Sequence, residues 1–174
     1  MAKEAVASLL RECRISVEWR DRERGSELEE RIRAECAKRD LSSAIHLNAA
    51  IETGVDIALH AYAHVGSDVQ YFIALYTMLG VTIDNHSVSQ QALEAYVACG
   101  KTSGEPILEW LAECLGSAHK YFEPYAAGTI VSATTGFLQS EILDMTMEKY
   151  SMTCQSLRFA ENRRIKSEIG RAHV

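Results

Sequence analysis

The sequence predicts an all-α protein, a bundle of helices without strands. Apolar residues recur at steps of three and four along most of the chain, which gathers them on one stripe of a helix. No stretch shows the alternation of apolar and polar residues that is typical of a strand. The chain has 174 residues, 47% of them hydrophobic, which suffices for one core but not for two ordinary domains.

The first two helices are predicted from apolar stripes and one start signal. Residues 3–19 carry the stripe Val6, Leu9, Leu10, Cys13 and Val17. Ser26 and Glu29 have the form of a capping box, in which each side chain bonds an orphan backbone N–H at a helix start. The stripe of the second helix consists of Leu28, Ile32 and Cys36.

Two further helices are expected on either side of a Gly-Ser break at residues 66–67. An Ala-rich helix covers residues 43–65, and a helix that is apolar nearly all round covers 68–83. Leaving a large apolar side chain such as Phe72 or Leu79 in water costs about 1.5–3 kcal/mol. We therefore expect residues 68–83 at the centre of the bundle.

The remaining chain predicts three helices. A short one covers 90–98, and a loop then leads to Pro106, which suits the first turn of the next helix. The apolar side of that helix consists of Ile107, Leu108, Leu111, Cys114, Leu115 and Phe122. A last helical stretch, 125–150, is interrupted by the helix-weakening run Thr134-Thr135-Gly136.

The charge and the cysteines limit the partners and the compartment. The net charge is −6 and the basic residues are scattered, so we expect no nucleic-acid partner. The longest apolar run, residues 71–83, is shorter than the roughly 20 residues that cross a bilayer as a helix, so we expect no membrane span. Five cysteines without a C-x-x-C pair, and a start without a signal peptide's apolar stretch, indicate a reduced, cytoplasmic protein.

Two patterns have simpler explanations than the sites they resemble. Residues 95–102 match a relaxed nucleotide-binding loop, but a helix precedes them and Pro106 follows, whereas that motif needs a strand and then a helix. We interpret them as a polar loop between helices. Asp56, His60 and His64 share one helical face, on which two imidazoles can bind zinc, but a polar stripe of a packed helix explains the same residues.

Asp84 is a more informative candidate. It ends the most apolar helix, where the helix dipole is negative and a carboxylate is disfavoured unless a cation accompanies it. The alternative is that Asp84 and Asn85 only terminate the helix, because Asn tolerates the left-handed conformation that is common at helix ends.

A resemblance to a known family is carried by four stretches, in order: residues 74–85, 92–96, 121–137 and 159–164. They resemble the trichodiene synthase family of fungal class I terpene cyclases, and the similarity spans roughly residues 8–164. The resemblance implies the helical bundle of the class I terpenoid synthase type, incomplete in this chain. Residues 1–168 would then be the N-terminal part of a single cyclase domain.

The resemblance also implies an activity. It is that of a sesquiterpene cyclase, a lyase that uses Mg²⁺ to ionise and cyclise farnesyl diphosphate with release of diphosphate. Asp84 takes the place of the first carboxylate of the family's aspartate-rich box, the catalytic residue that bridges magnesium to the substrate. Asn85 takes the second place as a metal ligand, while Ser87 and Val88 stand where further acids are expected.

Other matching residues concern the substrate. Arg163 matches the family's diphosphate-sensing arginine, whose planar fork suits bidentate contacts to phosphate oxygens. A pocket for a hydrocarbon cation needs a dry wall with π faces. The candidates for that wall are Phe72, Tyr76, Met78 and Phe137.

Part of the family's site has no counterpart in this chain. No residues satisfy the second magnesium motif, an Asn followed by Ser or Thr at +4 and by Glu at +8. We therefore expect a piece of a longer cyclase that is inactive by itself and whose full-length parent is a candidate homodimer. Residues 169–174 match what a common sequencing adapter encodes before a stop codon, which indicates a non-native tail.

Two other functions stay open at this stage. A noncatalytic helical domain would bind an apolar ligand or a partner helix, with Asp84 only closing its helix. A remnant without chemistry would still bind a prenyl diphosphate.

Overall fold

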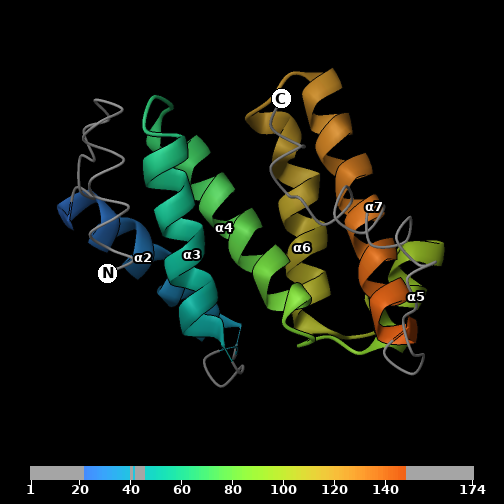
Figure 1. Cartoon of the computed structure of the whole chain (residues 1–174). Helices are drawn as coiled ribbons and strands as arrows, with labels where there is room; N and C mark the ends of the chain where they lie inside the picture. The colour runs from blue at the N-terminus through green and yellow to red at the C-terminus, as the bar shows by residue number, and fades with distance from the viewer. Residues whose placement is uncertain (1–21, 40, 42–45, 148–174) are drawn as a thin grey trace, which may run out of the picture.

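A computed structural model describes residues 22–39, 41 and 46–147, and within them every regular element is a helix (Figure 1). The helices are α2 (Arg22–Lys38), α3 (Leu47–Ala61), α4 (Ser67–Asp84), α5 (Gln90–Cys99), α6 (Pro106–Ser117) and α7 (Pro124–Met147), with one 3-10 turn, η1 (Ala118–Lys120). The prediction of an all-α fold is confirmed, while the helix expected at residues 3–19 lies outside the described residues.

The central place predicted for residues 68–83 is confirmed by α4. Twelve of its 18 residues are buried, and it contacts α2, α3 and α6. The helix α3 approaches it closely at Gly54, where an added Cβ would run into the carbonyl of Ala74 and lie 3.2 Å from the backbone nitrogen of Met78. Only a residue without a side chain fits this crossing.

Several predicted helix boundaries are wrong. The chain is already helical from Arg22, so Ser26 and Glu29 stand inside α2 and form no capping box at its start. Serine and glutamate are tolerated in helix interiors, so the pattern alone does not fix a start. The helix predicted from Pro106 to Phe122 ends at Ser117 and continues as η1.

The predicted interruption at Thr134-Thr135-Gly136 is also wrong, because α7 runs through it without a break. The hydroxyl of Thr134 donates to the carbonyl of Ile130 at 2.7 Å, and that of Thr135 donates to Val131 at 3.0 Å. Both hydroxyls are therefore satisfied by the helix itself, and they do not compete with its backbone hydrogen bonds.

The helix α3 is shorter than the predicted 43–65, since it ends at Ala61. The buried side chain of Gln70, in the first turns of α4, donates to the carbonyl of Tyr62 at 2.9 Å and to that of Ala58 at 3.4 Å. These carbonyls stand at the end of α3, where a helix leaves acceptors unsatisfied. A contact between two helices thus fixes the end of one of them.

The long helices α4 and α7 run in the same direction, with α6 running back between them (Figure 1). As a result, the start of α4 and the start of α7 lie at one end of the bundle, and the end of α4, α5 and the end of α7 lie at the other. The Nε2 of Gln90 in α5 donates to Oγ1 of Thr146 in α7 at 3.0 Å, and this hydrogen bond joins α5 to the end of α7. No described helix is both long and apolar enough to span a membrane.

Candidate functional site

The carboxyl end of α4 carries the predicted metal residues. Asp84 is the last residue of α4 and is exposed, and Asn85 follows with φ −79° and donates its backbone N–H to Val81 at 3.1 Å. The left-handed residue is His86, with φ 55°, and its N–H donates to Ile83 at 2.9 Å. Asn85 is therefore not the left-handed residue that the helix-terminating alternative invoked.

The segment after Asp84 is anchored at Val88 and Ser89. Val88 is only 1% exposed, and the hydroxyl of Ser89 accepts a hydrogen bond from the backbone nitrogen of Ala92 at 3.3 Å, which caps α5. The capping role accounts for Ser89 without any ligand. Asp84 thus lies on a turn whose backbone is held by a buried anchor and by a helix cap.

Oxygen donors at this turn suit magnesium better than zinc. Within the described ranges no three His, Cys, Asp or Glu side chains come together as a metal site. Magnesium needs fewer protein ligands, because one or two carboxylates commonly hold it together with waters and substrate phosphates. The carboxylate of Asp84 and the amide oxygen of Asn85 are ligands of the right type.

The zinc pattern at Asp56, His60 and His64 is not assembled. His64 lies in the turn after α3 and no longer shares a helix face with the other two residues. The Nδ1 of His60 lies 2.7 Å from the backbone oxygen of Asp56, so one ring nitrogen already has a partner.

The aromatic residues predicted to line a pocket are buried where α4 meets η1 and α7. The ring of Phe72, 3% exposed, stacks on Tyr76 with 6.2 Å between centroids and meets Phe122 edge-on at 5.3 Å. The hydroxyl of Tyr76 lies 2.8 Å from Oγ1 of Thr134 in α7, and burial raises the pKa of Tyr76. Phe137, one turn further along α7, is 6% exposed.

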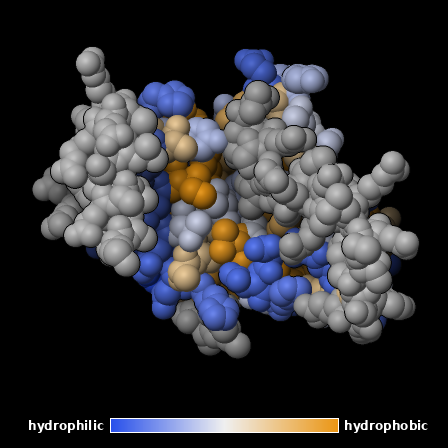
Figure 2. Space-filling model, in the orientation of Figure 1, coloured by the Kyte–Doolittle hydropathy of each residue, from blue (hydrophilic) through white to orange (hydrophobic). Residues whose placement is uncertain are grey.

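A groove of about 360 Å³ opens where α3 ends and where α4 and α7 begin. Six of the residues that line it are Tyr62, Val69, Ile73, Phe122, Tyr125 and Ile130. Its lining is mostly apolar, and a cavity of this size is within the range of small-molecule sites. Figure 2 shows apolar residues gathered in the middle of one face of the molecule, with hydrophilic residues around them.

The sequence did not single out these lining residues. Of the predicted wall, neither Phe72, Tyr76, Met78 nor Phe137 lines the groove. Because α4 is apolar on nearly every side, its pattern does not show which side faces a cavity. The spacing of Val69 and Ile73, one turn apart, is the only sequence signal, and it becomes informative once the position of α7 is known.

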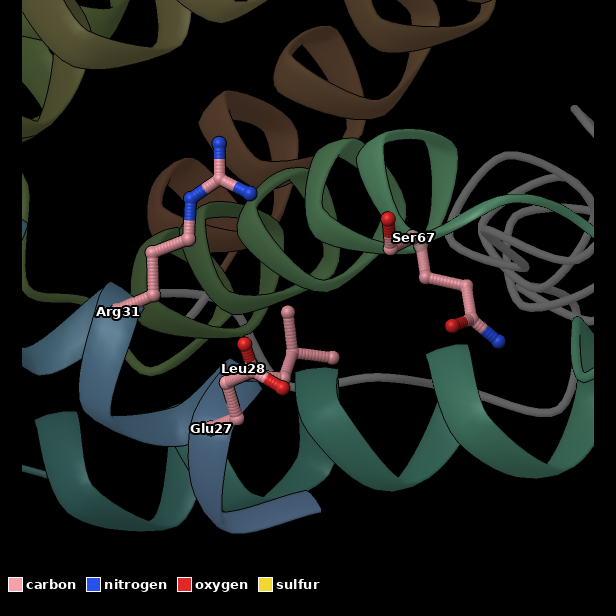
Figure 3. A pocket seen from close by; sticks show the side chains of 5 residues that line it. Glu27, Leu28, Arg31 and Ser67 are labelled. Carbon is pink, nitrogen blue, oxygen red and sulfur yellow. The ribbon is translucent and has the colours of Figure 1, made fainter. Parts of the chain in front are cut away.

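A second, smaller cavity of about 140 Å³ lies between α2 and the start of α4 (Figure 3). Arg31 of α2 stands there with its guanidinium 3.7 Å from the ring centroid of Tyr71 and 3.6 Å from Asp68. Gln70, which also lines the cavity, is committed to the carbonyls of α3. These contacts show that Arg31 and Gln70 hold neighbouring helices together.

Comparison with known proteins shows a partial similarity. The chain has distant, partial homology to a fungal terpene synthase, which agrees with its all-helical fold. The relative is Terpene synthase 29 of Postia placenta (strain ATCC 44394 / Madison 698-R), 30% identical over 120 residues, which are 66% of this chain and 35% of the relative. The matched part thus spans about a third of the relative's length. No protein-family model and no solved structure matches the chain.

The expected relation to terpene cyclases is therefore confirmed at the level of terpene synthases, and the narrower trichodiene synthase family stays a prediction. The roles of Asp84, Asn85, Phe72, Tyr76 and Phe137 are predictions as well. Arg163 and the tail 169–174 lie outside the described residues.

Proposed function

We propose that this chain is part of a sesquiterpene cyclase that ionises and cyclises farnesyl diphosphate with release of diphosphate. The observation that carries the proposal is that Ile73, in the groove lining, and Asp84 lie on one face of α4. Steps of four, three and four residues lead from Ile73, which lines the groove, through Thr77 and Gly80 to Asp84. At 1.5 Å per residue, Ile73 and Asp84 are separated by about 16 Å along the helix. A diphosphate at Asp84 would place its hydrocarbon chain along this face, toward the groove.

The headgroup end of the proposed site is the turn at Asp84 and Asn85. These two residues would hold Mg²⁺, which when bound supplies electrostatic stabilisation to the departing diphosphate. Arg163 is proposed to contact the phosphate oxygens with its guanidinium fork. The proposal thus assigns the carboxyl end of α4 to the charged half of the substrate.

The hydrocarbon end of the proposed site is apolar. Ile73 of α4 and Ile130 of α7 both line the groove and are 2% and 4% exposed. Such walls exclude water, which would otherwise quench an allylic cation. Phe72, Tyr76 and Phe137 do not line the groove, and we propose their π faces for the hydrocarbon cation behind it, where Phe72 meets the lining ring of Phe122.

Diphosphate binding tests the headgroup end directly. Inorganic diphosphate is titrated calorimetrically into the chain with and without Mg²⁺, for wild type, Asp84→Asn and Asp68→Asn. Asp68 is a matched control, because it is another exposed aspartate of α4 at the opposite end of the helix. We expect Asp84→Asn to weaken the magnesium-dependent binding at least about tenfold, and Asp68→Asn to leave it unchanged. Equal binding by all three proteins would remove Asp84 from the site.

A noncatalytic domain for an apolar ligand is a second candidate, favoured by the groove itself. Tyr125 at its rim is 88% exposed, which is unusual for a large aromatic side chain. This function predicts that farnesol binds the groove with the same affinity in wild type and Asp84→Asn, whether or not Mg²⁺ and diphosphate are present.

A further inference from the structure

Thr77 differs from every other threonine in the described helices. Its side chain is 2% exposed, and its hydroxyl has no hydrogen-bond partner in the part of the chain that the structure describes. The other helical threonines each donate to the carbonyl four residues earlier: Thr53, Thr82, Thr129, Thr134, Thr135 and Thr146. Thr77 makes no such bond to Ile73.

A buried hydroxyl without a partner is unfavourable, because it has lost its hydrogen bonds to water and gained none in return. Thr82 of the same helix avoids that penalty, because its hydroxyl donates to the carbonyl of Met78 at 2.8 Å. The hydroxyl of Thr77 is thus a buried polar group that is available to interact with a ligand.

The helix places Thr77 between the two ends of the proposed site. It lies one turn after Ile73, which lines the groove, and two turns before Asp84. Neighbouring faces of α4 are occupied, because Ala74 and Met78 face the crossing with α3, and Tyr76 bonds to α7. Thr77 is therefore on the strip of α4 that joins the groove to Asp84.

We propose that Thr77 is a specificity-determining residue, whose hydroxyl oxygen stabilises positive charge on the hydrocarbon part of an ionised isoprenoid. This inference rests on the proposed cyclase function. At 1.5 Å per residue, Thr77 lies about 10 Å along the helix from Asp84, too far for its hydroxyl to contact a diphosphate held there. Because the surrounding wall is apolar, the lone pairs of a single hydroxyl oxygen favour those carbocations whose positive charge lies beside that oxygen. Thr77 forms no covalent bond and accepts no proton.

Binding of a charged and an uncharged analogue tests this assignment. The probes are a farnesyl-like tertiary amine, protonated at neutral pH, and the hydrocarbon of the same skeleton. Each displaces a fluorescent apolar probe in the presence of Mg²⁺ and inorganic diphosphate. The variants are Thr77→Val, which keeps the shape, Thr77→Ser, which restores the hydroxyl, and Thr82→Val. Thr82 is the matched control, because it is equally buried on α4 and its hydroxyl is already bonded to Met78.

We expect wild type, Thr77→Ser and Thr82→Val to prefer the ammonium analogue, and Thr77→Val to lose about tenfold or more of that preference. Magnesium-dependent diphosphate binding should be equal in all four proteins. A preference that survives in Thr77→Val, or that is absent from wild type while diphosphate binding depends on Asp84, overturns the role of Thr77 and leaves the proposed function standing. Diphosphate binding that does not depend on Asp84 overturns the proposed function and, with it, this inference.

Discussion

Two threonines of α4 offer a comparison at the scale of single side chains. Thr77 and Thr82 are both buried, but only Thr82 has a hydrogen bond, 2.8 Å long, to the carbonyl of Met78. Thr77→Val should leave the free energy of unfolding unchanged or raise it by about 1 kcal/mol, because it removes an unsatisfied hydroxyl. Thr82→Val should lower it by about 0.5–1.5 kcal/mol. Urea denaturation of both variants measures the difference, and a lower stability for Thr77→Val would mean that its hydroxyl has a partner.

The buried thiol of Cys114 predicts a pH dependence of stability. Burial raises the pKa of Cys114 from its ordinary value of 9.0 to about 12. The folded state therefore favours the protonated thiol, and the resulting stability is fully present below about pH 9 and is lost as the pH rises toward 12. Between about pH 8 and about pH 10, wild type should lose about 1 kcal/mol more than Cys114→Ala.

Urea denaturation at the two pH values gives the free energies of unfolding. Identical slopes for wild type and Cys114→Ala would show that the thiol of Cys114 titrates as in the unfolded chain.

At the scale of elements, the crossing of α3 and α4 depends on one glycine. A Cβ at Gly54 would collide with the backbone of α4, which a side-chain rotation cannot relieve. Gly54→Ala should therefore cost roughly 2–4 kcal/mol by separating the two helices. Gly128 of α7 is the matched control, because a Cβ there meets nothing within 4 Å, and Gly128→Ala should stabilise the protein by about 0.5–1 kcal/mol. Thermal unfolding of the two variants would show shifts of opposite sign.

The sequence predicted the helices whose limits are set locally and missed those set by contacts. The helix predicted at 68–83 is α4, Ser67–Asp84, because Gly66 precedes it and its apolar run ends at Asp84. The end of α3 was missed, since Ala61 and the residues after it are compatible with a helix. The side chain of Gln70 marks that end by binding carbonyls of α3, and such a contact leaves no trace in local spacing.

At the scale of the whole molecule, the position of Asp84 at the end of the buried helix followed from the sequence, whereas the groove did not. Ile73 and Ile130 line the same groove although 57 residues separate them, and only the parallel run of α4 and α7 brings them together. The sequence predicts Phe72 and Tyr76 for a pocket wall because they are aromatic. In the structure the ring of Phe72 packs against Tyr121, directly after η1, and the hydroxyl of Tyr76 lies beside Thr134 of α7. Because α4 is apolar on nearly every side, its sequence does not show which of its residues face these neighbours.

If the groove and Asp84 belong to one site, a ligand that reaches both should bind much more tightly than its parts. Joining two binding groups makes the second contact intramolecular and raises affinity by roughly 100-fold or more when the spacing fits. We therefore expect the unreactive thiolo analogue of farnesyl diphosphate, with Mg²⁺, to bind at least about 100-fold more tightly than farnesol or inorganic diphosphate. Asp84→Asn should reduce its affinity to that of farnesol.

Blocking the other end gives the complementary result. Ala126→Trp fills the groove from α7, so the thiolo analogue should bind this variant no better than inorganic diphosphate does, while diphosphate itself binds as in wild type. Val131→Trp, at an exposed position of the same helix that does not line the groove, is the control and should bind like wild type. A noncatalytic apolar-ligand domain gives a different pattern, in which farnesol and the thiolo analogue bind equally and only Ala126→Trp weakens them. Competition titrations of the three ligands against wild type and these variants therefore decide whether the two ends of α4 act as one site.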